Sequence, residues 1–100
     1  MPKLAIVATI EVEPGRRDQL WPALVAHRTR CLRDEPGITL QMEFLAPYGD
    51  DTKVLLYEVY RDEAAFALHR EGQSIAQFRK DTAGMIVKSH VTKCAFLGDQ

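Results

Sequence analysis

The sequence predicts an α+β domain with the element order β-α-β-β-α-β and one antiparallel sheet. Apolar residues alternate along four short stretches, recur at helical spacing between them, and are separated by proline-glycine pairs and other turn residues. A chain of 100 residues has room for one core. We therefore expect a single domain over residues 1–100.

The first strand and the first helix follow from a change of periodicity. Alternation near the N-terminus puts one set of residues on a covered face: Leu4, Ile6, Ala8, Ile10 and Val12. Ala5 and Val7 on the opposite face indicate that this face is covered as well. Helical spacing then runs from about Arg16 to Arg33, and Glu35-Pro36-Gly37 ends the helix.

The second half of the chain predicts a hairpin, a helical region and a last strand. The second strand places Ile38, Leu40, Met42, Phe44 and Ala46 on one face. A turn over residues 47–51 leads to a third strand, Lys53 to Arg61. Asp62 fits the N-cap of a short helix, Gly72 interrupts the helical pattern, and a strand follows from about Met85 to Leu97. This order is that of the ferredoxin-like split βαβ fold.

One face of such a sheet remains uncovered by the chain's own helices. The alternation leaves apolar side chains there, and a small chain has no further element to cover them. The simplest cover is the same face of a second copy. We therefore expect a two-fold homodimer.

Charge and hydropathy exclude several classes of protein. The 13 Lys and Arg against 14 Asp and Glu give a net charge of −1, without a block of one sign. Arg28, Arg30 and Arg33 are interpreted as the solvated face of the first helix, so no nucleic-acid partner is expected. No apolar run has the length of a membrane span, and the start, Met1-Pro2-Lys3-Leu4, lacks the apolar segment of a signal peptide. We expect a cytoplasmic protein without a membrane partner.

The cysteines and histidines predict no metal site. Cys31 and Cys94 lie far apart in a sequence without CxxC or zinc-type Cys/His spacing, and His27, His69 and His90 are widely separated. The two cysteines are interpreted as small core residues. His27 lies near the polar border of the first helix, so we expect it to be exposed to solvent.

A family resemblance rests on several short motifs in a fixed order. They are Val7-Ala8-Thr9-Ile10, Pro14-Gly15-Arg16-Arg17-Asp18, Glu35-Pro36-Gly37, Tyr57-Glu58-Val59-Tyr60 and Asp62-Glu63-Ala64-Ala65-Phe66, followed by His69. Together they resemble the antibiotic biosynthesis monooxygenase family from residue 4 to about 80. The resemblance implies a dimeric α/β barrel with a small pocket between each sheet and its helices.

Members of that family catalyse different reactions. They include cofactor-free monooxygenases that oxidise quinols or polycyclic phenols, haem-degrading enzymes and an isomerase, so the family implies a fold rather than one reaction. The haem-degrading branch depends on an asparagine, and this chain contains none.

Cofactor-free oxygenation has simple chemical requirements. Ground-state oxygen reacts slowly with closed-shell organic molecules, so the substrate must first lose a proton and become electron-rich. A base in a dry pocket and donors for the resulting oxyanion are sufficient. We therefore expect oxidation of a small aromatic quinol or phenol by molecular oxygen, with no cofactor.

Two residues are predicted to be catalytic. His69 occupies the family's histidine position three residues after Phe66, and imidazole is the side chain whose ordinary pKa lies near neutrality. Glu58 matches the family's strand-three glutamate and is expected to orient His69. The alternatives are that His69 caps the helix, and that Glu58 makes a structural contact with His69, Arg79 or a tyrosine hydroxyl.

Six further residues are predicted to contact a substrate, with a place in the core as the alternative for the aromatic ones: Tyr60, Phe66, Phe78, Phe44, Trp21 and Arg79. Two other functions stay open beside oxygenation. One is an isomerase or lyase in which His69 moves a proton without oxygen. The other is a non-catalytic dimer that binds a ligand or serves in a stress response.

Overall fold

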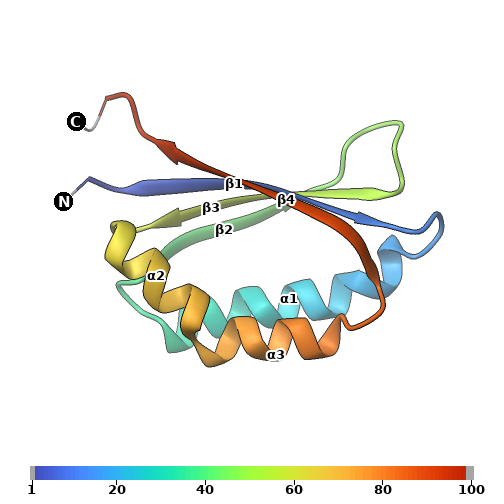
Figure 1. Cartoon of the computed structure of the whole chain (residues 1–100), viewed down its shortest axis with the longest axis horizontal. Coiled ribbons are helices and arrows are strands. Elements are labelled where there is room, and N and C mark those ends of the chain that lie inside the picture. The colour runs from blue at the N-terminus through green and yellow to red at the C-terminus, as the bar shows by residue number, and fades with distance from the viewer. Residues whose placement is uncertain (1, 99–100) are drawn as a thin grey trace.

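One antiparallel sheet and three helices make up the computed structural model, which describes residues 2–98 (Figure 1). The elements are β1 (Leu4–Val12), α1 (Arg17–Asp34), β2 (Thr39–Leu45), β3 (Lys53–Tyr60), α2 (Glu63–Glu71), α3 (Gln73–Asp81) and β4 (Ile86–Ala95). The predicted α+β, ferredoxin-like fold is confirmed, with the second helical region divided at Gly72. Among the described residues, no helix is long and apolar enough to cross a membrane.

The sheet has the strand order β2-β3-β1-β4, and every neighbouring pair is antiparallel. The predicted hairpin of β2 and β3 is therefore confirmed. All three helices lie on one side of this sheet, with α1 and α3 side by side (Figure 1). The other side is covered by no element of the described chain.

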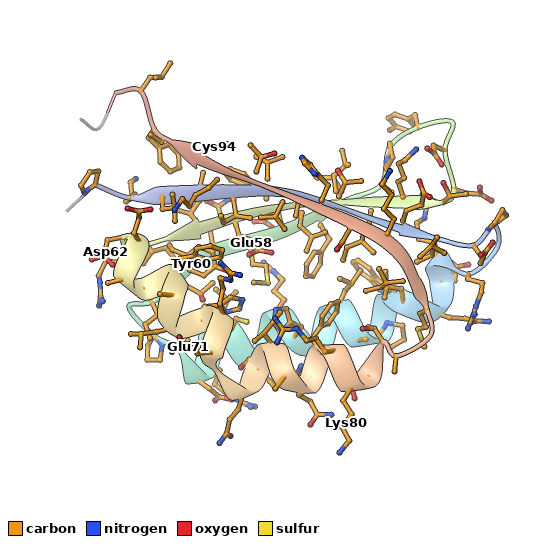
Figure 2. The ribbon with its side chains drawn as sticks, in the orientation of Figure 1. Glu58, Tyr60, Asp62, Glu71, Lys80 and Cys94 are labelled. Atoms are coloured by element: carbon orange, nitrogen blue, oxygen red, sulfur yellow. The ribbon has the colours of Figure 1, made fainter. Side chains whose placement is uncertain are left out.

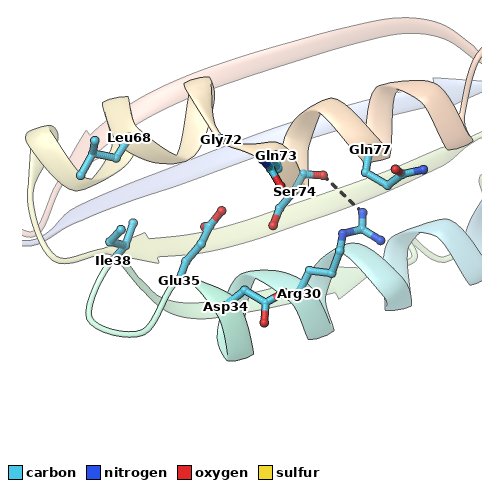
Figure 3. A pocket seen from close by; sticks show the side chains of 9 residues that line it. All are labelled: Arg30, Asp34, Glu35, Ile38, Leu68, Gly72, Gln73, Ser74 and Gln77. Atoms are coloured by element: carbon cyan, nitrogen blue, oxygen red, sulfur yellow. Dashed lines mark hydrogen bonds between the residues drawn. The ribbon is translucent and has the colours of Figure 1, made fainter.

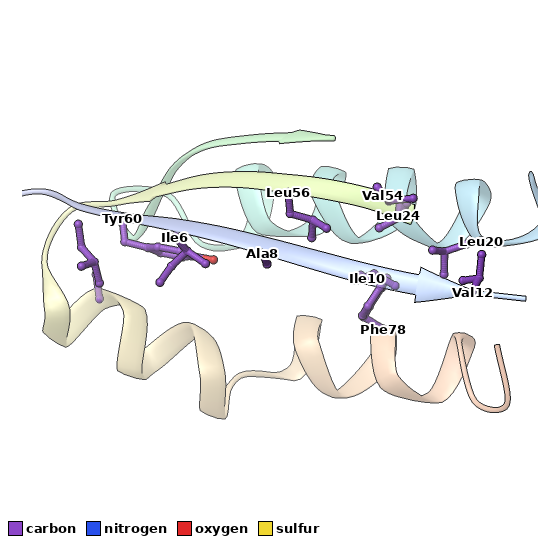
Figure 4. Close-up of a cluster of buried hydrophobic side chains, with 12 residues drawn as sticks. Ile6, Ala8, Ile10, Val12, Leu20, Leu24, Val54, Leu56, Tyr60 and Phe78 are labelled. Carbon is purple, nitrogen blue, oxygen red and sulfur yellow. The ribbon is translucent and has the colours of Figure 1, made fainter. Parts of the chain in front are cut away.

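The core lies between this sheet and its helices (Figure 4). The alternation of β1 is confirmed, because Leu4, Ile6, Ala8, Ile10 and Val12 are all buried. Leu20 and Leu24 of α1 are fully buried against them, and Phe78 of α3 closes the layer. Each large apolar side chain in this layer stabilises the fold by roughly 1.5–3 kcal/mol.

The predicted alternation of β2 is wrong at the start of the strand. The register of β2 against β3 shifts between Thr39 and Gln41. Thr39 is 4% exposed and faces the helices, whereas Leu40 is 47% exposed. The cause is the extra residue that a bulge inserts, which turns the first side chain of the strand inward. Met42 is fully buried, so the predicted alternation resumes there.

The helical cover of the sheet does not extend to β4. Val91 pairs with Ala8 and so lies on the helix side of the sheet, yet it is 56% exposed. On the opposite side, Val7 is 46% and Leu45 is 53% exposed. The expectation that the helices cover one complete face therefore holds for β1, β2 and β3 and is wrong for β4.

The bulge can be tested by comparing two apolar truncations in β2. Met42→Ala is expected to lower the free energy of unfolding by about 2–5 kcal/mol, because it empties a fully buried site. Leu40→Ala is expected to cost less than about 1 kcal/mol, because Leu40 is largely in water. Urea denaturation measures both values. Equal losses of stability would contradict the register shift.

Candidate active site

A buried pair of side chains joins the end of α1 to the end of α2. Nδ1 of His69, in the last turn of α2, lies 3.0 Å from Oε1 of Glu35, the residue that follows α1. The His69 side chain is 4% exposed and that of Glu35 is 12% exposed. Because water reaches little of either group, the loss of either one would leave the other with an unmet hydrogen bond.

Two local features of the backbone position the Glu35 carboxylate. The bulge in β2 turns Thr39 inward, and its hydroxyl donates to the same Oε1 at 3.0 Å. On the other side, a Cβ at Gly72 would lie 3.4 Å from Oε2 of Glu35 and 3.3 Å from the carbonyl oxygen of Leu68. Glycine at this position therefore gives the carboxylate room beside the junction of α2 and α3.

Glu58 and Tyr60 project from β3 toward the helices (Figure 2). The Tyr60 hydroxyl donates to Oε1 of Glu58 at 2.5 Å. Burial raises the pKa of the Glu58 carboxyl, although the hydrogen bond from Tyr60 and the nearby His69 oppose the rise. Burial also raises the pKa of Tyr60, and the charge of Glu58 adds to this, so the phenol stays protonated.

These contacts correct the predicted role of Glu58. The carboxylate that hydrogen-bonds to His69 is Glu35, whereas Glu58 accepts from Tyr60. The tyrosine hydroxyl was one of the three partners expected for Glu58. The reason for the difference is geometric: α1 ends beside His69 and brings its own carboxylate there.

His27 and Cys31 lie one turn apart on the buried face of α1. The Cys31 Sγ is 3.5 Å from Nε2 of His27 and 3.8 Å from Nδ1 of His69. His27 is 2% exposed, so its predicted exposure is wrong, because α3 packs over the border of the helix face. The expected place of Cys31 in the core is confirmed.

The His27 imidazole and the Cys31 thiol are both uncharged at neutral pH. Burial, and then the nearby His69, lower the pKa of His27 to about 4, against a weaker opposing effect of the Ser74 carbonyl. Burial, and then the carboxylates of Glu35 and Glu58, raise the pKa of the Cys31 thiol to about 12. The thiol is therefore no nucleophile in this state.

Three of the predicted binding residues gather around His69 in a row of rings. The ring centroids of Phe66 and Tyr60 are 5.0 Å apart, and those of Tyr60 and His69 are 5.1 Å apart. The row continues from His69 to His27 at 5.5 Å and from His27 to Phe78 at 4.9 Å. The His69 imidazole therefore lies between the rings of Tyr60 and His27, and Phe66 and Phe78 form the two ends of the row.

The other three predicted binding residues lie elsewhere. Trp21 is 54% exposed and meets Phe44 edge to face, with ring centroids 6.2 Å apart. Arg79 is exposed on α3. Arg79 points away from the sheet into solvent, and Trp21 lies near the opposite end of α1 from Glu35.

A cavity of about 400 Å³ opens between the end of α1 and the junction of α2 with α3 (Figure 3). Its lining consists of Arg30, Asp34, Glu35, Ile38, Leu68, Gly72, Gln73, Ser74 and Gln77. None of the six residues predicted to bind substrate is among them. Glu35 belongs both to this lining and to the buried pair with His69.

Arg30 is the cationic group of this cavity. Its Nη2 donates to the carbonyl oxygen of Ser74 at 3.3 Å, and its buried Nε has no acceptor among the described residues. Arg30 is thus only partly on the solvated helix face that the sequence predicts, because its Nε is buried. The structure offers this guanidinium as a donor to an anionic group in the cavity.

Sequence reasoning missed several of these residues for identifiable reasons. Glu35 was interpreted as the end of a helix, because Pro36 and Gly37 follow it. His27 and Cys31 stand four residues apart, a spacing that places both on one helix face, and this was the available signal. The inward turn of Thr39 depends on a bulge and has no such signal.

Glu58 allows a test of what it costs in stability to bury a carboxylate between the sheet and the helices. Its raised pKa means that the folded protein binds the Glu58 proton more tightly than the unfolded chain does. The stability from this proton is complete below the ordinary value of 4.5 and is lost as the pH rises through the folded-state pKa. An amide does not titrate, so Glu58→Gln is expected to be more stable than the wild type at neutral pH, by about 1–2 kcal/mol.

Thermal unfolding between about pH 4 and pH 8 measures the effect, and the advantage of Glu58→Gln should grow as the pH rises. Glu71→Gln is the matched control, because Glu71 is exposed on α2, and its difference from the wild type should change little with pH. An advantage that shrinks with rising pH would show instead that the charged Glu58 stabilises the fold.

Comparison with known proteins places the chain in a family. The sequence model for antibiotic biosynthesis monooxygenase matches residues 4–81. No curated protein matches the chain in sequence.

Solved structures share its fold. A candidate antibiotic biosynthesis monooxygenase from Nitrosomonas europaea is 17% identical with a TM-score of 0.85, covering 95% of this chain and 90% of its own. PA3566 from Pseudomonas aeruginosa is 21% identical with a TM-score of 0.85, covering 97% and 96%. Rv0793 from Mycobacterium tuberculosis is 22% identical with a TM-score of 0.81, covering 95% of each chain. With the family match extending from β1 to the end of α3, the chain belongs to the antibiotic biosynthesis monooxygenase family.

Proposed function

We propose that the protein is a cofactor-independent monooxygenase that oxidises a small aromatic quinol or phenol with molecular oxygen. The observation that carries the proposal is the buried hydrogen bond of 3.0 Å between His69 and Glu35, with Glu35 in the wall of a cavity of about 400 Å³. Family membership supports oxygenase chemistry on this scaffold.

His69 acts as the base in this proposal, and Glu35 orients it. With the proton on Nδ1 donated to Glu35, Nε2 is the ring nitrogen that takes the hydroxyl proton of the substrate. The net charge of His69 and Glu35 together then changes from −1 to zero. In a site with little water, this change favours proton transfer, because the new imidazolium lies beside a carboxylate.

Arg30 stabilises the phenolate that remains. Its guanidinium lies in the cavity wall with one buried donor still free among the described contacts. Ile38 and Leu68 supply apolar surface for the aromatic ring of the substrate. The cavity thus combines an apolar contact with a cation, which suits a phenolate.

The phenolate supplies all the electrons that oxygen requires. One oxygen atom enters the ring and becomes a carbonyl oxygen, and the other leaves as water. The two hydrogens of that water come from the hydroxyl group and from the ring carbon that is oxidised. From a phenol the product is a quinone. From a quinol the same insertion of one oxygen atom and loss of one water gives a hydroxyquinone. The rings of Tyr60, Phe66 and Phe78 help to keep water out of this layer during the reaction.

We also propose that two copies associate through the face of the sheet opposite the helices. Val7 and Leu45 are half exposed there, and Leu55 and Tyr57 lie partly buried on the same face. A two-fold axis would bring this surface against itself and bury these side chains without a further element.

Oxygen consumption tests the proposed activity. With a panel of naphthoquinols, the wild type should consume one oxygen molecule for each hydroxyquinone formed and should release no hydrogen peroxide. His69→Gln is expected to lower kcat by about 10²–10⁴-fold, because it removes the base. Glu35→Gln should lower kcat by at least about tenfold with little effect on KM, because it loosens the orientation of the base and not the binding of substrate.

Glu71→Gln removes an exposed carboxylate two residues after His69 and should leave turnover unchanged. Equal rates for Glu35→Gln and the wild type would contradict the role of the pair. Turnover that continues without oxygen would replace oxygenation by proton transfer, as in an isomerase or lyase. Ligand binding without turnover in either condition would leave a non-catalytic dimer.

The dimer has its own test. Light scattering should give twice the chain mass of 11.3 kDa, and Val7→Lys should shift it toward the monomer, because the charge would lie in the contact. Val87→Lys is the control, because Val87 is exposed on the edge strand β4. A wild type that stays monomeric at all concentrations would contradict the proposed association.

A further inference from the structure

Three side chains that bind transition metals converge beneath the sheet. His27, Cys31 and His69 are all buried, and each offers one ligand atom within 4.8 Å of the others. Two of them lie on α1 and the third on α2, so the cluster depends on how the two helices pack. Glu35, the residue one turn beyond Cys31, lies beside the same cluster and hydrogen-bonds to His69.

We propose that His27, Cys31 and His69 bind a zinc ion, with the Glu35 carboxylate as the fourth ligand. This site goes beyond the proposed oxygenase and does not depend on it. The spacing of the donor atoms is the first argument. Two ligands bound tetrahedrally at the usual zinc distances are about 3.5 Å apart when one is sulfur and the other nitrogen.

The measured distances are close to this requirement. The Cys31 Sγ lies 3.5 Å from Nε2 of His27 and 3.8 Å from Nδ1 of His69. Oε1 of Glu35 lies 3.0 Å from the same Nδ1. Side-chain shifts of about 1 Å or less would bring these donor atoms to the separations of a tetrahedral zinc site. The two imidazoles would have to approach each other by somewhat more.

A second argument is the hydrogen bonding behind the ligands. Nδ1 of His27 lies 3.3 Å from the carbonyl oxygen of Ser74, so the proton belongs on that nitrogen. Nε2 of His27 then presents its lone pair toward the Cys31 sulfur. An imidazole that donates its second nitrogen to a backbone carbonyl is the arrangement that orients histidine ligands in zinc proteins.

Charge balance is the third argument. Zinc carries two positive charges, and one thiolate and one carboxylate bring the net charge to zero once both imidazoles are neutral. A neutral assembly has the smallest desolvation cost in a buried place. Binding forms the zinc–sulfur bond and breaks the S–H bond of Cys31, so one proton leaves to the solvent. The Nδ1 proton of His69 moves to Nε2 at the same time.

The cavity next to the cluster provides a route for the ion. Glu35 and Ser74 line that cavity, and both contact members of the cluster (Figure 3). A carboxylate at the inner wall is a suitable first ligand for an entering cation. The ion would then pass from oxygen to the nitrogen and sulfur ligands that zinc prefers.

Zinc and the proposed base require opposite tautomers of His69. When Nδ1 binds the metal, it no longer donates to Glu35, and Nε2 carries a proton and accepts none. Zinc-loaded protein is therefore expected to lose the base function. If the chain proves to have no oxygenase activity, the metal site is unaffected.

Cobalt titration of the full, metal-free chain under reducing conditions tests the site. The wild type should bind one cobalt ion with the strong visible bands of tetrahedral cobalt and a near-ultraviolet thiolate-to-cobalt band, and zinc should displace the ion. Zinc addition should release one proton per chain and, at about 100 times Kd, raise Tm by roughly 10 °C. A wild type without the thiolate band overturns the proposal by itself, and no variant is needed for that result.

Cys31→Ala should abolish the thiolate band and weaken zinc binding at least tenfold, and far-ultraviolet circular dichroism checks that it folds. Cys94→Ala is the matched control, because Cys94 lies on β4 (Figure 2) and pairs with Ala5 on the face of the sheet opposite the helices, so it should retain the band. Loss of the band in Cys94→Ala instead of Cys31→Ala contradicts the site. Glu35→Gln should keep the thiolate band and weaken zinc binding, and unchanged affinity would remove Glu35 from the ligand set.

Discussion

The Glu35 carboxylate is the interaction on which the arrangement of this protein depends. Its Oε1 accepts from the Thr39 hydroxyl and from His69, both at 3.0 Å, and thereby joins the end of α1, the start of β2 and the end of α2. Each of these partners is buried, so the loss of the carboxylate would leave two polar groups without an acceptor, at about 1–3 kcal/mol each. The bulge in β2 brings Thr39 to this carboxylate, and Gly72 lies beside it.

The space between sheet and helices is more polar than stability alone would require. Glu58, Tyr60, His27 and His69 lie there, where apolar side chains of the same size would cost less to bury. Burial shifts the pKa of Glu58 and of His27 in opposite directions, and in each case it favours the neutral form. One end of the core thus contains polar groups that are costly to bury, whereas β1 and α1 form an ordinary apolar core at the other end. Such a contrast is typical of a functional site.

The alternation of apolar residues was enough to predict the fold, because along β1 and β3 all side chains of one face meet the helices and those of the other face do not. The same reasoning failed at Leu40 and Thr39, where one extra residue reverses the faces, and at His27, whose exposure depends on where α3 packs. Family motifs pointed to His69 and Glu58, yet the partner of His69 comes from a residue 34 positions away that the motifs mark only as a helix end. Contacts between helices are set by their packing angles, which the sequence pattern does not contain.

One geometric condition underlies both chemical uses of this site. A base in a dry pocket needs an imidazole with a free lone pair and a carboxylate beside it. A zinc site needs an imidazole and a carboxylate too, together with a thiolate. Cys31 is that addition, because it lies 3.8 Å from Nδ1 of His69. Proton transfer needs the ring proton on Nδ1 and metal binding needs it on Nε2, so the two uses of His69 exclude each other. Bound zinc fixes the tautomer in which Nε2 accepts no proton, so activity would depend on the free zinc concentration around the protein.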